Sequence, residues 1–122
     1  MCKILLSINP EHVANIMAGV KLYEFRKIQC KEKVDKIIIY STSPVMKVVG
    51  EADVEEIIVD EPEKVWDITG QNSGISKAFF DSYYRNSDKA VAYKLANVKK
   101  YKKPQSLLNY GVKNAPQSFV YV

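Results

Sequence analysis

Three residues with charged side chains lie close together at positions 21, 24 and 26 of this 122-residue chain. Lys21 follows Gly19, where a helix is expected to end, and Glu24 and Arg26 fall two apart in an alternating stretch. Residues two apart on a strand share a face and lie about 6.5–7 Å apart. The carboxylate can accept from an amine or ring N–H, and the guanidinium can pair with a phosphate or stack on a base. The pattern predicts either a ligand site or an ordinary ion pair on a solvated sheet face.

The sequence lacks the well-known catalytic motifs. Its five scattered glycines cannot form a phosphate-binding loop or a dinucleotide fingerprint, and there is no His-Glu-x-x-His pair. In an enzyme, catalysis would therefore fall to lysine and carboxylate groups. Lys21 would activate a hydroxyl or a water, with Glu24 or Glu51 carrying the proton. Glu24, Glu51 and Asp53 could also hold a metal ion, but we predict no metal and no other cofactor.

The single histidine and the two cysteines receive no functional role from the sequence. Cys2 and Cys30 lack metal-ligand spacing, and we expect free thiols, as is typical of a reducing compartment. His12 falls in an expected helix, with nothing in the sequence to orient it. No apolar run approaches the roughly 20 residues of a membrane-spanning helix, and the start is too short for a signal peptide. We therefore expect a cytoplasmic protein of one domain, residues 1–122.

Charge is unevenly distributed along the chain, whose formal net charge is +4. Residues 94–103 hold five lysines and no acid, whereas residues 51–63 hold seven acids and no base. This predicts a basic part and an acidic part of the surface. The basic part permits a nucleic-acid partner, with Lys94, Lys99, Lys100, Lys102 and Lys103 following a phosphate backbone, although solvated faces explain each run equally well.

The expected elements are mostly strands. Asn9-Pro10-Glu11 is a helix start, with Asn9 as the cap and Pro10 in the first turn. Asp60 and Glu63 have capping-box spacing at a second helix, and Ser76 can cap a third. Gly50 predicts a bulge in a long strand. Strands are expected at 3–8, 22–27, 34–40, 47–59, 90–101 and 118–122, and helices at 10–20, 62–69 and 76–84. Without a repeated βαβ rhythm, this order favours an α+β fold, a small and mostly antiparallel β-barrel with flanking helices.

The central motif resembles that of the ASCH family in the PUA-like superfamily, in which a Gly-x-Lys-x-x-Glu-x-Arg core follows the first helix. Here that core is residues 19–26. The resemblance extends over nearly the whole chain, through residues 7–10, 40–44, 49–52, 74–80 and 116–119. It implies a PUA-like barrel with a cleft beside the first helix, and a protein that binds RNA or recognises a modified base.

The resemblance leaves the activity open. As a binding module, the chain would hold RNA or a nucleotide through Lys21, Glu24 and Arg26, with Ser41, Thr42 and Ser43 lining the cleft. As an enzyme, it would resemble ASCH ribonucleases or the branch that deacylates N4-acetylcytidine. In that branch Lys21 would match the lysine, but Glu24 replaces a threonine. A third alternative is a protein-interaction domain using the acidic stretch and the aromatic helix. The sequence favours the binding module and does not indicate an oligomeric state.

Overall fold

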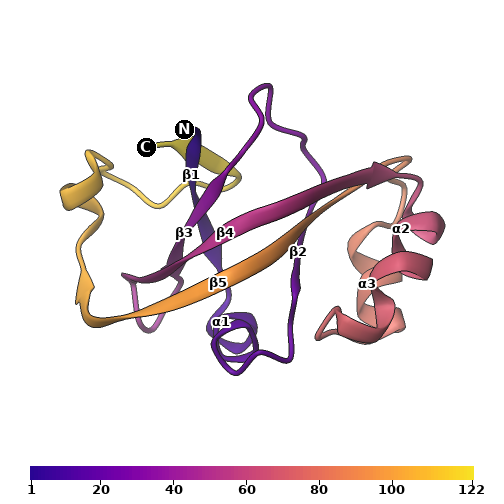
Figure 1. Ribbon diagram of the computed structural model, residues 1–122, viewed down its shortest axis with the longest axis horizontal. Helices are drawn as coiled ribbons and strands as arrows, with labels where there is room; N and C mark the ends of the chain where they lie inside the picture. The colour runs from indigo at the N-terminus through magenta and orange to yellow at the C-terminus, as the bar shows by residue number, and fades with distance from the viewer.

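A six-stranded sheet runs through the computed structural model, which describes all of residues 1–122 (Figure 1). The strands follow the order β2-β5-β4-β3-β1-β6, and only β1 and β3 pair in parallel. The sheet curls into a half-barrel, so the α+β fold class is confirmed while β2 and β6 remain as two edges. The strands are Lys3–Ile8 (β1), Tyr23–Arg26 (β2), Lys36–Ser41 (β3), Lys47–Asp60 (β4), Ala90–Gln105 (β5) and Phe119–Tyr121 (β6).

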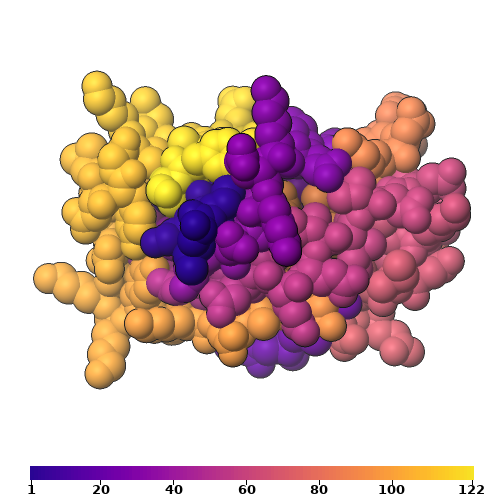
Figure 2. Space-filling model, turned by 45° about the horizontal axis from the view of Figure 1, so that its top comes forward, coloured from indigo at the N-terminus to yellow at the C-terminus, as the bar shows by residue number.

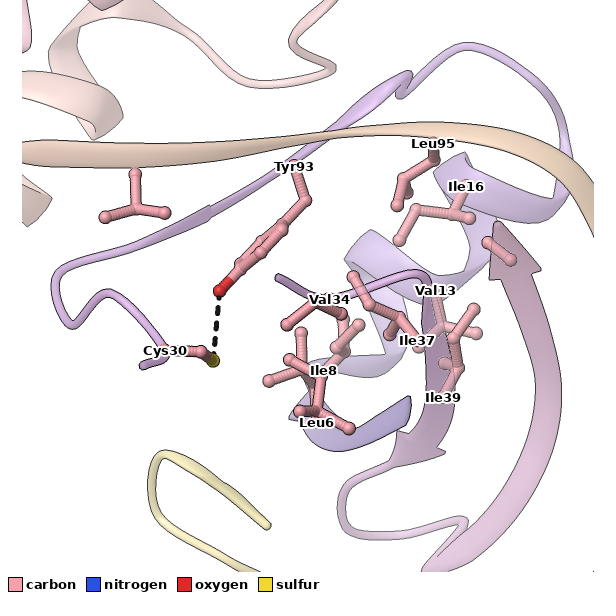
Figure 3. Packing of buried hydrophobic residues seen from close by; sticks show 13 residues of the cluster. Leu6, Ile8, Val13, Ile16, Cys30, Val34, Ile37, Ile39, Tyr93 and Leu95 are labelled. Carbon is pink, nitrogen blue, oxygen red and sulfur yellow. Dashed lines mark hydrogen bonds between the residues drawn. The ribbon is translucent and has the colours of Figure 1, made fainter. Parts of the chain in front are cut away.

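The helix α1, Pro10–Met17, joins β1 to β2 and covers the inner face of the sheet. Its start is as expected, because the Asn9 side chain accepts a hydrogen bond from the Glu11 N–H at 3.0 Å. The helix buries Val13 and Ile16 in a cluster of 13 residues that includes residues of β1, of β3 and of the first half of β5 (Figure 3). Within this cluster, Cys30 Sγ lies 3.4 Å from the Tyr93 hydroxyl, and both cysteines are free thiols.

Two further helices, α2 (Pro62–Thr69) and α3 (Lys77–Tyr83), lie together at one end of the molecule (Figure 1). A 3-10 turn, Gly70–Asn72, connects them. As expected, the Ser76 hydroxyl caps α3 by accepting from the Phe79 N–H at 3.1 Å. The capping box expected at Asp60 and Glu63 is wrong: Glu61 is the N-cap of α2 without a side-chain bond, and the Asp60 carboxylate accepts from the Glu61 N–H instead.

The strands β4 and β5 form a long antiparallel ladder with three irregularities in register. One lies at Gly50, where the sequence predicted a bulge. A side chain at Gly50 would run into the Lys99 carbonyl and approach Met17 Cε to 2.7 Å. The glycine therefore lets the β5 backbone and the end of α1 both pack closely against β4, because a backbone without a Cβ can be approached from that side.

The same ladder corrects the expected division into an acidic and a basic surface. Glu51 lies opposite Lys99 in the register, and Glu56 lies opposite Lys94. Lys36, on β3, adds an ion pair of 2.6 Å with Glu51. The acidic and basic runs are therefore neighbours in one sheet, since antiparallel pairing brings the two long strands side by side.

The last segment of the chain packs on the other face of the sheet and on its edge. The 3-10 helix Leu107–Tyr110 and the strand β6 cover a small cluster around Leu5 and Val48. The two termini lie together, where the Val122 N–H donates to the Lys3 carbonyl at 3.1 Å (Figure 1). None of the helices reaches the length and apolar character that a membrane crossing requires.

Candidate functional site

A cavity of about 300 Å³ opens between α1, β2 and α3. Its walls come from three separate parts of the chain: residues between Ser7 and His12, residues 21–26, and α3 with the preceding Ile75. This volume lies at the lower end of the range for small-molecule sites. Lys21, Glu24 and Arg26 all line this cleft. Their close spacing in the sequence thus corresponds to one site in space.

Lys21 lies in the cleft wall with only 2% of its surface exposed. Its Nζ donates to the Ser73 carbonyl at 2.9 Å and lies 4.8 Å from the centre of the Phe25 ring. Gly74, at φ +71°, packs directly on the stem of the lysine, where a Cβ would meet Lys21 Cβ at 2.5 Å. Burial lowers the pKa of Lys21 below its ordinary value of 10.5, and the nearby charge of Glu24 opposes this shift. A buried amine of this kind can donate to a ligand or, once neutral, accept a proton.

Glu24 and Arg26 form an ion pair within the cleft and not on an open sheet face. Both Arg26 Nε and Nη2 donate to the same carboxylate oxygen, Glu24 Oε2, at 3.0 and 2.7 Å. Nη2 also donates to the Ser7 carbonyl at 2.8 Å, which fixes the guanidinium against β1. Glu24 Oε1 and Arg26 Nη1 make no hydrogen bond within the protein, and neither is sealed from solvent. The ion pair therefore leaves one acceptor and one donor free for a ligand.

His12 lies in the same cleft, although nothing in the sequence indicated this position. Its ring meets that of Phe79 edge to face, with the ring centres 5.4 Å apart. Its Nδ1 is buried without a hydrogen-bond partner. Burial, and next the charge of Lys21, lower the pKa of His12 below 6.5, so the imidazole is neutral at pH 7.

The aromatic side chains of α3 divide between two environments. Phe80 and Tyr84 are buried in a core cluster with Phe25 and Val65. Phe79 is 49% exposed, and it lines the cleft together with Tyr83. Burial raises the pKa of the Tyr83 hydroxyl. The aromatic side chains of α3 therefore supply both a packing face and a flat apolar surface for a ligand. The apolar surface becomes evident only from the spatial arrangement of α1 and α3.

The other residues named from the sequence lie elsewhere. Ser41 ends β3, Thr42 and Ser43 follow it, and none of the three lines the cleft. Ser41 is buried, and the Thr42 N–H donates to the Ile8 carbonyl. Glu51 lies among Lys36 and Tyr101, away from the cleft. No group of three metal-ligating side chains is present. The structure thus brings together the motif residues, and it does not bring the hydroxyl residues or Glu51 to them.

A curled mixed sheet with a cleft beside its first helix defines a PUA-like α+β protein. The model of a family described as "Domain of unknown function (DUF365)" matches residues 16–115. The crystal structure of ASCH from Zymomonas mobilis superimposes with a TM-score of 0.88 and 26% identity, covering 98% of this chain and 87% of that chain. The chain belongs to this family of unknown function and is a member of the ASCH domain family.

Curated relatives extend the comparison to longer proteins. An "ASCH domain-containing ribonuclease" of Zymomonas mobilis is 32% identical over 92 residues, which are 75% of this chain and 62% of that protein. The large ribosomal subunit protein uL22 of Ureaplasma parvum serovar 3 is 32% identical over 120 residues. That match covers 98% of this chain but only 39% of the ribosomal protein. This chain thus spans well under half the length of that relative.

Proposed function

We propose that this chain binds RNA or a nucleotide in the cleft between α1, β2 and α3. One observation carries the proposal: the Glu24–Arg26 ion pair, which keeps an unused acceptor (Oε1) and an unused donor (Nη1), lines the same cleft as buried Lys21. The edge of a nucleobase presents neighbouring donors and acceptors of this kind. Glu24 would accept from an amine or ring N–H, Arg26 and Lys21 would donate, and Phe79 offers a face for base stacking.

The name of the Zymomonas mobilis ribonuclease supports RNA as the ligand class. So does the chemistry of the cleft, which combines two cationic groups with aromatic surface. Single-stranded RNA fits such a site best, because its unstacked bases can enter a cleft and stack on aromatic rings. Ser41, Thr42 and Ser43 are left out of this binding mode because they do not line the cleft.

The test compares two glutamate variants in titrations of labelled single-stranded RNA followed by fluorescence anisotropy. Glu24→Gln removes the charge that receives the ligand's N–H, and a charge-assisted hydrogen bond contributes about 1.5–3 kcal/mol. We expect roughly 10- to 100-fold weaker binding. Glu51→Gln is the matched control, since it makes the same change outside the cleft, and should bind like the wild type. Equal affinity of the two variants, or no RNA binding at low salt, would overturn the proposal.

RNA cleavage or hydrolysis of a nucleoside amide is a second candidate, favoured by the lowered pKa of Lys21 in the cleft. A neutral amine at this position could take a proton from an attacking hydroxyl or water. Incubation with RNA and with N4-acetylcytidine, compared with Lys21→Met, tests this candidate. Product formed by the wild type and lost in Lys21→Met supports it. An inactive wild type, or equal activity of the two proteins, contradicts it.

A further inference from the structure

A group of exposed lysines gathers where β5 ends and β4 begins. We call it the β5 lysine cluster; it consists of Lys47, Lys99, Lys100, Lys102 and Lys103, all of them exposed. None of the five forms an ion pair, whereas Lys36 and Lys94, farther along the sheet, are within 4.0 Å of carboxylates. The end of β5 and the segment after it, coloured orange to yellow, form one end of the molecule, where side chains project into solvent (Figure 2).

The ladder itself explains why this charge is not compensated. The acids of β4 begin at Glu51, which lies opposite Lys99, so residues 47–50, opposite Lys100 and the end of β5, offer no carboxylate. Glu51 is already bonded to Lys36 at 2.6 Å and to the Tyr101 hydroxyl at 2.8 Å. Like charges held close together repel one another, most strongly at low ionic strength. A bound polyanion would relieve this repulsion.

The cleft lies near the start of α1, and the cluster lies near its end. Residues at the start of α1 line the cleft, whereas Met17 at its end meets the backbone around Gly50 and Lys99. Lys100 lies directly opposite Gly50 in the register, and directly opposed residues project to the same face of a sheet. Lys100 therefore projects on the α1 side of the sheet, whereas Lys99, which lies opposite Glu51, projects on the outer face. The helix has only eight residues, about 12 Å of length, so the two surfaces are within reach of one short oligonucleotide.

We propose that the β5 lysine cluster binds the phosphate backbone of an RNA strand whose base occupies the cleft. The ligand is then a polynucleotide and not a free nucleotide. The inference rests on the proposed function for the base. The cluster supplies the electrostatic, sequence-independent part of the affinity, because each neutralised phosphate releases counterions. The cleft supplies the contacts to one base.

The experiment measures the salt dependence of binding to a labelled single-stranded RNA of about 12 nucleotides, between roughly 50 and 300 mM KCl. The test variant combines Lys99→Gln, Lys100→Gln, Lys102→Gln and Lys103→Gln. The control combines Lys31→Gln, Lys33→Gln, Lys64→Gln and Lys89→Gln, which remove the same charge from exposed lysines elsewhere. Each lost phosphate contact lowers the slope of log K against log salt by about 0.7 for a single strand.

We expect the test variant to lose up to about 3 units of slope and roughly tenfold or more in affinity at low salt, while the control keeps most of both. Glu24→Gln should weaken binding with an unchanged slope, because Glu24 contacts no phosphate. Equal slopes for the test and control variants would overturn the inference and leave the cleft proposal standing; the lysines would then only solvate the strand. A wild type that does not bind RNA at low salt would overturn both.

Discussion

The ammonium group of Lys21 is buried without an ion pair. Its Nζ has one carbonyl partner, that of Ser73, and the face of the Phe25 ring, and no carboxylate lies within 4.0 Å. These contacts replace water only in part, which is why burial lowers the pKa of Lys21. A buried ionisable group with a shifted pKa in a cleft is typical of functional sites. The burial of Lys21 should therefore affect the free energy of unfolding measurably.

This effect is a dependence of the free energy of unfolding on pH. Between the lowered pKa of Lys21 in the folded chain and its ordinary value of 10.5, the unfolded chain binds more protons, so stability rises with pH in this interval. We expect the free energy of unfolding of the wild type to gain on that of Lys21→Met as the pH rises toward 10.5. Urea unfolding of both proteins between pH 7 and that value measures the difference. A difference that stays constant would contradict the expected shift.

Lys36→Met is the matched control for this measurement. The hydrogen bond that Lys36 donates to Glu51 raises the pKa of Lys36, so the sign is opposite to that of Lys21. The contribution of Lys36 is fully present below 10.5 and is lost as the pH rises through the raised pKa. The difference between the wild type and Lys36→Met should therefore stay level up to pH 10.5 and decrease beyond it.

At the scale of elements, α3 supplies the wall of the cleft that faces the motif residues on β2. The helix has only seven residues, and isolated helices of this length are not stable in water. Its position depends on Phe80, which is fully buried, and on the Ser76 cap. The cap therefore matters for the wall that Phe79 and Tyr83 form.

Replacing the cap tests this dependence. Ser76→Ala leaves the Phe79 N–H without its acceptor and should lower the free energy of unfolding by about 1 kcal/mol. Ser82→Ala, an exposed site in the same helix, should have no effect or stabilise slightly, because alanine is the better helix former. Thermal and urea unfolding of both variants measure the effect. Equal stability of the two would show that the hydroxyl contributes nothing to α3.

The sequence predicted the helices and strands better than the long-range contacts between them. Alternation and caps are local signals, so the strands and the starts of α1 and α3 could be predicted from neighbouring residues. The motif placed Lys21, Glu24 and Arg26 together for the same reason. The contact between His12 and Phe79 could not be predicted, because 67 positions separate them and it depends on how α1 and α3 lie around β2. The pairing of acidic β4 with basic β5 depends on the register in the same way.

At the scale of the whole molecule, the two faces of the sheet differ in role. The cleft lies on the α1 side, and hydrogen bonds that join the strands lie on the outer face. On the outer face Glu51 Oε1 accepts from Tyr101 and Oε2 from Lys36, and these bonds join β3, β4 and β5. The hydrogen bonds, first that from Lys36 and then that from Tyr101, lower the pKa of Glu51. Glu51, which the sequence offered as a catalytic carboxylate, is therefore in a position to stabilise the sheet.

This position predicts how Glu51→Gln changes stability with pH. A carboxylate with a lowered pKa contributes stability that is present above its ordinary value of 4.5 and is lost as the pH falls through the lowered pKa. At pH 7 the variant should be less stable by about 0.5–1 kcal/mol, a modest amount because Lys36 and Glu51 are partly solvated. The deficit should shrink once the pH falls below 4.5, and RNA affinity at pH 7 should not change. Urea unfolding across this pH range, with anisotropy at pH 7, measures both. Weaker RNA binding by a fully stable Glu51→Gln protein would place this carboxylate in the ligand site after all.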